Sequence, residues 1–358
     1  MINEEAIQAA LQEKKEILTK RIVENMPELP QAIYLVGGYG RGEGAWYEDE
    51  KGLHPYNDFD LAVVTDSPLP HEKTEILRKQ LAQEVGIKWV DIDYYTIEKL
   101  SSLTPTIHNV DLLEGATLIY GHDVIKQNHL SLNKQEIGVH DLIILYQTRM
   151  WTFLGSWEGP FRDLDVAEAR FFKNQMAKAV LAACDLRLVK LKQYVTSYRE
   201  RANRVMNRFA SYNNLCELVD WAIKEKMCPS SSDLAKQDME MLYFRVKDVF
   251  LQSFEYAFGK YASYYLNPYK TRWYYLLHTK TYLSHIYSLI RNHRSKITRV
   301  VDVFYAMNYV LHANNHGTID CVMLKEASKL LIKHGFIKQP NSSWDELRIL
   351  TANARNNM

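Results

Sequence analysis

The sequence predicts an α/β domain with a small mixed sheet over residues 1–130, followed by an all-α helical bundle over residues 131–358. In the first part, short runs of β-branched and aromatic residues alternate with an amphipathic stretch, which is typical of β-α-β structure. In the second part, long stretches with helical periodicity contain few glycines or prolines. Residues 1–125 contain 11 basic and 22 acidic residues, whereas residues 126–358 contain 33 and 21. The net charge of +1 therefore averages two oppositely charged parts with different electrostatic roles.

The elements of the first domain follow from its hydrophobic pattern. In chain order we expect a charged helix over residues 4–23, a strand over 32–36, a strand over 58–65, a helix over 72–85 and a strand over 87–96. The intervening residues 45–57 are polar and contain Gly52 and Pro55, which predicts a loop.

The second domain is predicted to consist of helices that end near prolines, at Pro160, Pro229, Pro268 and Pro340. The helices expected from periodicity cover residues 138–154, 164–193, 198–227, 232–265, 269–292, 297–313, 319–335 and 343–354.

The chain lacks the sequence features of secreted and membrane-spanning proteins. Its longest apolar stretches, such as Ala32–Val36 and Ala179–Cys184, are far shorter than the roughly 20 residues that a membrane span needs. The N-terminal residues show no basic segment followed by an apolar one, so we expect a cytoplasmic protein with no membrane partner. The four cysteines form no CxxC motif, which argues against a zinc ribbon or a disulfide framework.

Two pairs of aspartates on predicted strands carry the first chemical signal. Asp58 and Asp60 are two residues apart, so on a strand both carboxylates leave the same face. Neighbouring carboxylates repel each other unless a cation lies between them, and oxygen ligands of this kind suit Mg²⁺ or Mn²⁺. Asp91 and Asp93 repeat the spacing on the next strand. If the two strands are neighbours, a third carboxylate reaches the same ions.

A glycine-rich stretch, GGYGRGEG over residues 37–44, follows the first predicted strand. Without side chains, Gly37 and Gly38 let the backbone approach a ligand closely, and backbone amides at such a turn favour phosphate oxygens. Arg41 adds a cation nearby. The stretch matches neither the P-loop pattern nor GxGxxG, so those two nucleotide-binding folds are not indicated. A phosphate cradle followed by a metal-binding acid pair indicates phosphoryl or nucleotidyl transfer.

These motifs together resemble the DNA polymerase β-like nucleotidyltransferase superfamily, over roughly residues 30–125. The segments GGYGRGE and NDFD are particularly similar to bacterial uridylyltransferases of nitrogen regulation. The resemblance implies that Gly37 and Gly38 contact the triphosphate of an NTP such as ATP, while Asp58 and Asp60 hold two Mg²⁺ or Mn²⁺ ions. It also implies a third carboxylate that acts on the acceptor hydroxyl. Asp91 is the preferred residue for this role and Asp93 its competitor.

The sequence departs from the superfamily pattern in two respects. The usual Gly-Ser pair is replaced by Gly37-Gly38, so a serine contact to phosphate is missing. The spacing to Asp58 is also roughly ten residues longer than usual, which indicates an inserted loop at residues 44–52. In related architectures a helix of the second domain supplies a lysine to the triphosphate. Lys173 and Lys178 are the candidates here, and the segment Tyr194–Arg199 resembles an element of small-substrate transferases.

The function predicted from these features is metal-dependent transfer of a nucleoside monophosphate from an NTP to a hydroxyl, with release of pyrophosphate. The acceptor stays open: a small hydroxylated molecule ranks slightly above an RNA 3′ end, and a protein hydroxyl and a second nucleotide are further alternatives. The basic run Arg187–Arg208 fits either an exposed helical face or a track for phosphates. The alternative prediction is a catalytically silent nucleotide-binding or interaction module of the same fold.

Overall fold

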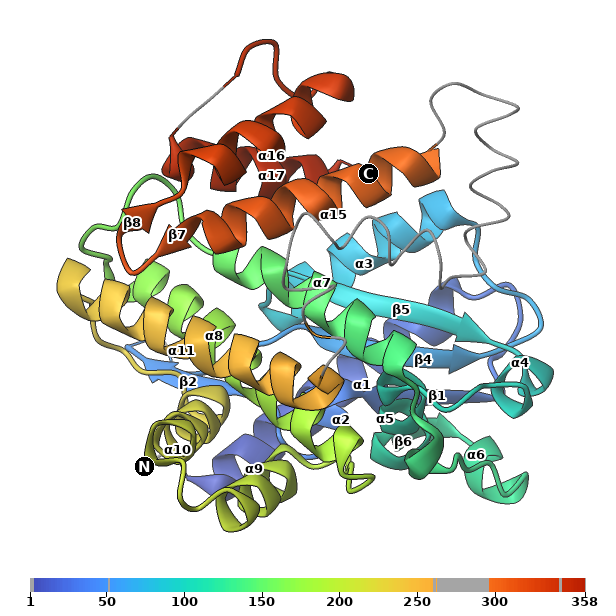
Figure 1. The fold of residues 1–358 in the computed structure, drawn as a ribbon. Helices are drawn as coiled ribbons and strands as arrows, with labels where there is room; N and C mark the ends of the chain where they lie inside the picture. The colour runs from blue at the N-terminus through green and yellow to red at the C-terminus, as the bar shows by residue number, and fades with distance from the viewer. Residues whose placement is uncertain (1–2, 51, 260–261, 263–295, 341–342, 358) are drawn as a thin grey trace. The chain divides into compact units, whose positions relative to one another are not determined.

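The computed structural model of the protein describes residues 3–50, 52–259, 262, 296–340 and 343–357 (Figure 1). The chain divides into two compact units, which we describe separately. Unit 1 contains Met1–Asp141, Leu191–Ala210 and Asp220–Ser230, and unit 2 contains Leu142–Lys190, Ser211–Val219 and Ser231–Met358. The predicted division at residue 130 therefore differs from these units, because two segments from the predicted helical domain group with the N-terminal part.

A four-stranded mixed sheet forms the centre of unit 1, in the order β5-β4-β1-β6. Strand β1 is antiparallel to both β4 and β6, whereas β4 and β5 are parallel and joined through a helix. The small sheet expected from the sequence is thus confirmed. Its strands are β1 (Ala32–Val36), β4 (Phe59–Val64), β5 (Val90–Tyr95) and β6 (Thr117–Gly121).

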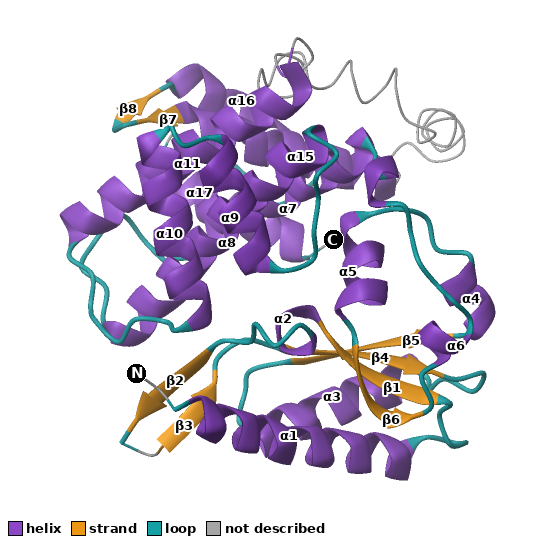
Figure 2. Ribbon diagram, turned by 90° about the horizontal axis from the view of Figure 1, so that it is seen from below, coloured by secondary structure: helices purple, strands orange, loops and turns teal. Residues whose placement is uncertain are grey.

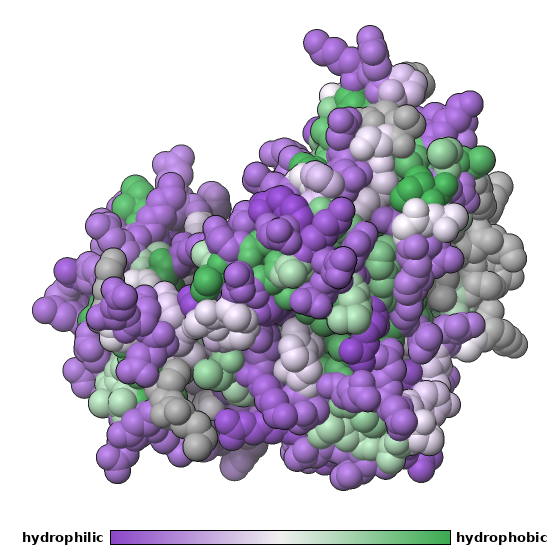
Figure 3. All heavy atoms as spheres, turned by 90° about the vertical axis from the view of Figure 1, so that its left-hand side faces the viewer, coloured by the Kyte–Doolittle hydropathy of each residue, from purple (hydrophilic) through white to green (hydrophobic). Residues whose placement is uncertain are grey.

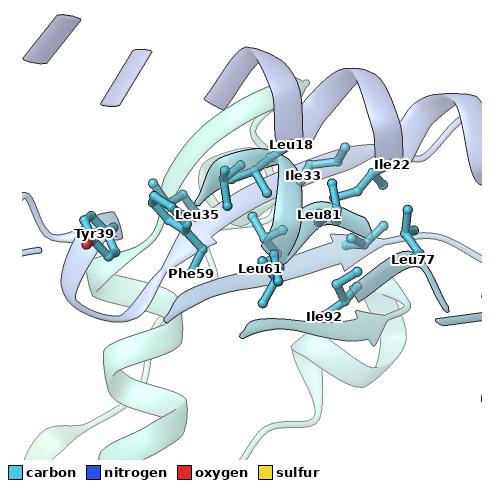
Figure 4. Packing of buried hydrophobic residues seen from close by; sticks show 14 of the residues in the cluster. Leu18, Ile22, Ile33, Leu35, Tyr39, Phe59, Leu61, Leu77, Leu81 and Ile92 are labelled. Carbon is cyan, nitrogen blue, oxygen red and sulfur yellow. The ribbon is translucent and has the colours of Figure 1, made fainter. Parts of the chain in front are cut away.

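One face of this sheet is covered by α1 (Glu4–Asn25) and α3 (His71–Val85) (Figure 2). Figure 4 shows how inward-facing residues of the helices, including Leu18, Ile22 and Leu81, meet strand residues such as Ile33 and Leu61. All five are buried. Because alternate strand residues face opposite sides, this packing directs every second residue of β1, β4 and β5 away from the two helices.

The opposite face of the sheet has its own smaller core. Tyr34, Ala62 and Tyr95 lie on this face and pack with Leu112 of α5 (Ile107–Gly115). Figure 2 shows α5 on the side of the sheet opposite α1 and α3. Further short helices of the N-terminal segment are α2 (Gly37–Gly40), α4 (Ile97–Ser101), α6 (Val124–Gln127) and a 3-10 turn at Lys134–Glu136.

The segment 45–57, predicted to be a loop, is instead a β-hairpin. Strands β2 (Trp46–Asp49) and β3 (Gly52–Pro55) pair antiparallel, with Trp46 opposite Pro55 and Asp49 opposite Gly52. Trp46 is buried, which anchors the base of the hairpin, whereas Glu48, Asp49 and Glu50 at its tip are exposed. The predicted insertion at 44–52 is therefore part of a folded hairpin.

Unit 2 is built mainly from helices, as expected. Helix α8 is buried along most of its length and packs against α11, while α15 packs against α16 and α17. A short hairpin of β7 and β8 follows α15. The elements are α7 (Val139–Gly155), which begins at the end of unit 1, α8 (Val166–Lys190), α11 (Lys236–Phe258), α15 (Lys296–Ala313), β7 (Asn314–Asn315), β8 (Thr318–Ile319), α16 (Cys321–Lys333) and α17 (Trp344–Asn356).

One predicted helix, 198–227, is two helices in the structure. Helix α9 (Tyr198–Arg208) ends before residues 209–212, and α10 (Asn213–Met227) follows. The C-terminal half of α10 groups with unit 1 and its first turns with unit 2. The predicted helix 269–292 lies outside the described residues.

Among the described helices, none combines the length and the apolar character needed to cross a membrane. On the face shown in Figure 3, hydrophilic side chains predominate and apolar ones are scattered among them.

Candidate active site

The predicted acidic residues meet on the two parallel strands of unit 1. Asp60 of β4 pairs in register with Asp91 of β5, and on its other side with Val36 at the end of β1. Residues in register on neighbouring strands point to the same face, so the Asp60 and Asp91 carboxylates are neighbours on the face opposite α1 and α3. Both side chains are half-buried. Asp58 is exposed and lies directly before β4, which begins at Phe59.

The glycine turn begins directly against this acidic pair. Gly37 follows β1 and has φ +63°, in the left-handed region that favours glycine. A Cβ atom on Gly37 would lie 2.2 Å from Oδ2 of Asp60. Within the chain, the neighbour that Gly37 approaches closely is therefore the Asp60 carboxylate, whereas the predicted approach to a phosphate stays a prediction.

Other glycines of the stretch serve internal packing. A Cβ atom on Gly40 would lie 2.3 Å from the Leu35 carbonyl oxygen, and one on Gly44 would lie 2.0 Å from the ring of Tyr39. Tyr39 is buried, its ring packs on Phe59, and its hydroxyl donates to the Ala45 carbonyl at 2.7 Å. Burial raises the pKa of Tyr39, and the charges of Asp58 and Asp60 raise it further. Packing within unit 1 thus accounts for the glycines at positions 40 and 44.

The choice between Asp91 and Asp93 can be compared on geometry. Asp91 is level with Asp60, and its Oδ1 accepts a hydrogen bond of 2.7 Å from the Trp89 indole. Asp93 is exposed and pairs in register with Ala62, two residues further along the strands from the glycine turn. The register therefore favours Asp91 as the carboxylate beside Asp60.

The donor chemistry of this acidic site fits a hard divalent cation. Carboxylate oxygens on adjacent strands are the ligand type that Mg²⁺ and Mn²⁺ prefer, and such ions take remaining ligands from water and substrate phosphates. In the described part of the chain, no group of three or more His, Cys, Asp or Glu side chains is already arranged as a metal site. Asp60 and Asp91 supply a pair, and Asp58 lies two residues away at the entrance of β4.

Arg41, predicted to contact the nucleotide, is engaged inside unit 1. Its side chain is 5% exposed, and it forms ion pairs with Glu43 at 3.4 Å and with Asp111 at 3.3 Å. Its guanidinium also lies 4.5 Å from the ring centre of Tyr198. Two carboxylates and an aromatic ring already surround this cation, so we do not include it among the proposed phosphate ligands.

The two predicted lysines lie on α8 in unit 2. Lys173 is 8% exposed, and its Nζ donates to the hydroxyl of Ser232 at 2.9 Å and to the Ser232 carbonyl at 3.1 Å. Lys178 is half-buried on the same helix. Their predicted role at the triphosphate stays a prediction.

The basic run Arg187–Arg208 is not one exposed surface. Arg187 is buried and its Nε donates to the Ser253 hydroxyl, and Arg201 is 1% exposed. Arg204 pairs with Glu200 one helical turn earlier. Three of these arginines therefore have structural partners.

Sequence reasoning did not identify the residues that hold α9 in unit 1. They are two acids from the N-terminal part, Glu43 and Asp111, and partners from residues 194–201. The sequence did single out GGYGRGE and Tyr194–Arg199 separately. Nothing in their spacing indicated that these two segments meet.

Comparisons with known proteins add no family assignment. No family model matches this sequence, and a search of curated proteins finds no match either.

Proposed function

We propose that the protein is a metal-dependent nucleotidyltransferase, which moves a nucleoside monophosphate from an NTP to a hydroxyl acceptor. The observation that carries the proposal is the register of β4 and β5, which puts Asp60 and Asp91 side by side with Gly37 packed against Asp60. A half-buried acid pair next to a half-buried glycine turn suits a cation and a phosphate together.

In this proposal each group has a separate task. Asp58, Asp60 and Asp91 would hold Mg²⁺ or Mn²⁺, and the bound ions would neutralise charge on the triphosphate. Gly37 and Gly38 offer backbone that phosphates can approach without a side chain in between. Asp91 accepts the proton of the acceptor hydroxyl. The hydroxyl oxygen then bonds to the α-phosphorus, the bond from that phosphorus to the bridging oxygen breaks, and pyrophosphate leaves.

The test is transfer of label from [α-³²P]NTPs in the presence of Mg²⁺, with pools of small hydroxylated molecules and with RNA. Wild-type protein should form a labelled product, while Asp60→Asn should lose at least a hundredfold of the rate because the metal-binding charge is removed. Asp91→Asn should behave like Asp60→Asn, and Asp93→Asn should stay close to wild type. Glu48→Gln, an exposed acid at the tip of the hairpin, is the matched control.

Measuring acceptor binding at several salt concentrations separates the acceptor classes. If RNA is the acceptor, binding should weaken steeply with salt, because phosphate contacts release counterions. A small neutral acceptor should show little salt dependence. If Asp60→Asn transfers label as fast as wild type, the proposed mechanism is wrong. NTP binding with no labelled product from any acceptor would favour the silent nucleotide-binding module instead.

A further inference from the structure

A buried carboxylate from the glycine stretch caps helix α9. Glu43 is 5% exposed. Its Oε1 accepts from the Ser197 hydroxyl at 2.7 Å and from the Arg199 amide at 3.1 Å, and its Oε2 accepts from the Tyr198 amide at 2.8 Å. These amides belong to the first turn of α9, where backbone donors have no partner within the helix. Glu43 and Ser197, the residue that precedes α9, lie 154 residues apart in the chain and both belong to unit 1.

The backbone of Glu43 is tied to the glycine turn at the same time. The Glu43 amide donates to the Gly38 carbonyl at 2.7 Å, and the Arg41 amide donates to the Gly37 carbonyl at 3.3 Å. The main chain of Glu43 therefore contacts the glycine turn that is predicted to bind phosphate, and its side chain contacts α9. Glu43 thus links the Gly38 backbone directly to the first turn of α9.

Asp111 of α5 forms a second anchor beside the first. It accepts from Arg41 Nη1 at 3.3 Å, from Arg201 Nη2 at 2.8 Å and 2.9 Å, and from the Tyr194 hydroxyl at 2.7 Å. Arg201 also donates from Nε to the Val195 carbonyl at 2.5 Å. The residues that flank α9 are thereby fixed to α5.

The charges of this network balance. Arg41 and Arg201 oppose Glu43 and Asp111, and three of the four side chains are at most 6% exposed. In a buried environment such charge-assisted hydrogen bonds hold their geometry closely, because water cannot replace a lost partner. The network is therefore suited to fixing the position of a backbone turn.

We propose that Glu43 is a positioning residue for the nucleotide: it holds Gly37 and Gly38 in place by fastening the glycine turn to the start of α9. The inference rests on the proposed function, since it assigns the glycine turn to the triphosphate. It makes α9, a segment far along the chain, a required part of nucleotide binding without requiring that it touch the nucleotide.

The test measures KM for the NTP, KM for the acceptor and kcat in Glu43→Gln and Ser197→Ala. Glu43→Gln removes the charge that the two helix amides and the Ser197 hydroxyl share, and we expect KM for the NTP to rise at least tenfold with KM for the acceptor unchanged. Ser197→Ala removes one donor and should raise the same KM two- to fivefold. The control Glu200→Gln removes an exposed acid from the same helix turn and should leave both KM values unchanged.

Calorimetric titration with Mg²⁺ and a non-hydrolysable NTP gives a reading that does not depend on turnover. Weaker binding in both variants supports the inference. Wild-type nucleotide affinity in folded Glu43→Gln overturns it, and so does a fall in kcat alone. If Glu43→Gln does not fold, Ser197→Ala decides by the same criteria. Failure of the proposed function would look different: wild-type protein would bind the nucleotide and transfer nothing, while the affinity comparison would still report on Glu43.

Discussion

Gly37 is the residue at which backbone conformation and site chemistry impose the same requirement. Its φ of +63° favours glycine, and its missing side chain leaves room for the Asp60 carboxylate. Either reason alone would be ordinary. At Gly37 both reasons apply, next to the acids that pair in register on β4 and β5. Gly40 and Gly44 differ, because their neighbours are parts of the protein core.

Substituting Gly37 by alanine should therefore affect both stability and transfer. The left-handed conformation costs roughly 1 kcal/mol for a residue with a Cβ, and the new methyl group also displaces the Asp60 carboxylate. We expect loss of most transfer activity in Gly37→Ala. Gly86→Ala is the matched control, because Gly86 has φ +76° and open space around it. It should lose about 1 kcal/mol in urea unfolding while its specific activity stays unchanged. Equal activity in the two variants would contradict this account.

Secondary-structure elements show which local signals the sequence carries and which it lacks. Strand β1 and helix α3 were predicted within one residue of their ends, because long hydrophobic patterns and abrupt glycines mark them. The hairpin of β2 and β3 was missed because four-residue strands are too short to show alternation. The break between α9 and α10 was missed because residues 209–212 contain neither glycine nor proline.

A histidine between two helices of unit 2 provides a prediction at the scale of secondary-structure elements. His312 on α15 is half-buried, and its Nε2 lies 3.3 Å from the Tyr146 hydroxyl of α7. Desolvation of the imidazole, together with a smaller effect of the Lys247 charge, lowers the pKa of His312 from 6.5 to about 3. The folded protein thus keeps His312 neutral, whereas the unfolded chain takes up a proton below pH 6.5. Stability from this residue is present above pH 6.5 and is lost as the pH falls.

Urea unfolding at pH 7.5 and pH 5.5 checks this expectation. Wild-type protein should lose about 1.4 kcal/mol more between these two pH values than His312→Gln, which cannot titrate. Lys247, whose pKa burial lowers to about 8, is mostly protonated at both pH values and contributes little to the difference. If both proteins lose the same free energy, His312 does not remain neutral in the folded state.

At the scale of the whole molecule, the structure explains part of the uneven distribution of charge along the sequence. The acidic N-terminal part is joined within unit 1 by the basic segment around α9, where Arg201 pairs with Asp111. Sequence reasoning located the acids of the candidate site and the strands that carry them. It did not predict that residues 191–210 return to this unit, because pairing of buried charges between distant segments leaves no periodic pattern. For the same reason the sequence did not indicate that Arg41 pairs with Glu43 and Asp111.

The central claim is that the acids of β4 and β5 hold divalent metal together with an NTP. Titration of Mn²⁺ into the full-length protein with a non-hydrolysable NTP, followed by electron paramagnetic resonance, tests it without knowledge of the acceptor. We predict nucleotide-dependent Mn²⁺ binding in wild-type protein and in Glu48→Gln, and at least tenfold weaker binding in Asp60→Asn. Equal Mn²⁺ binding by wild-type protein and Asp60→Asn, with both folded, would contradict the account.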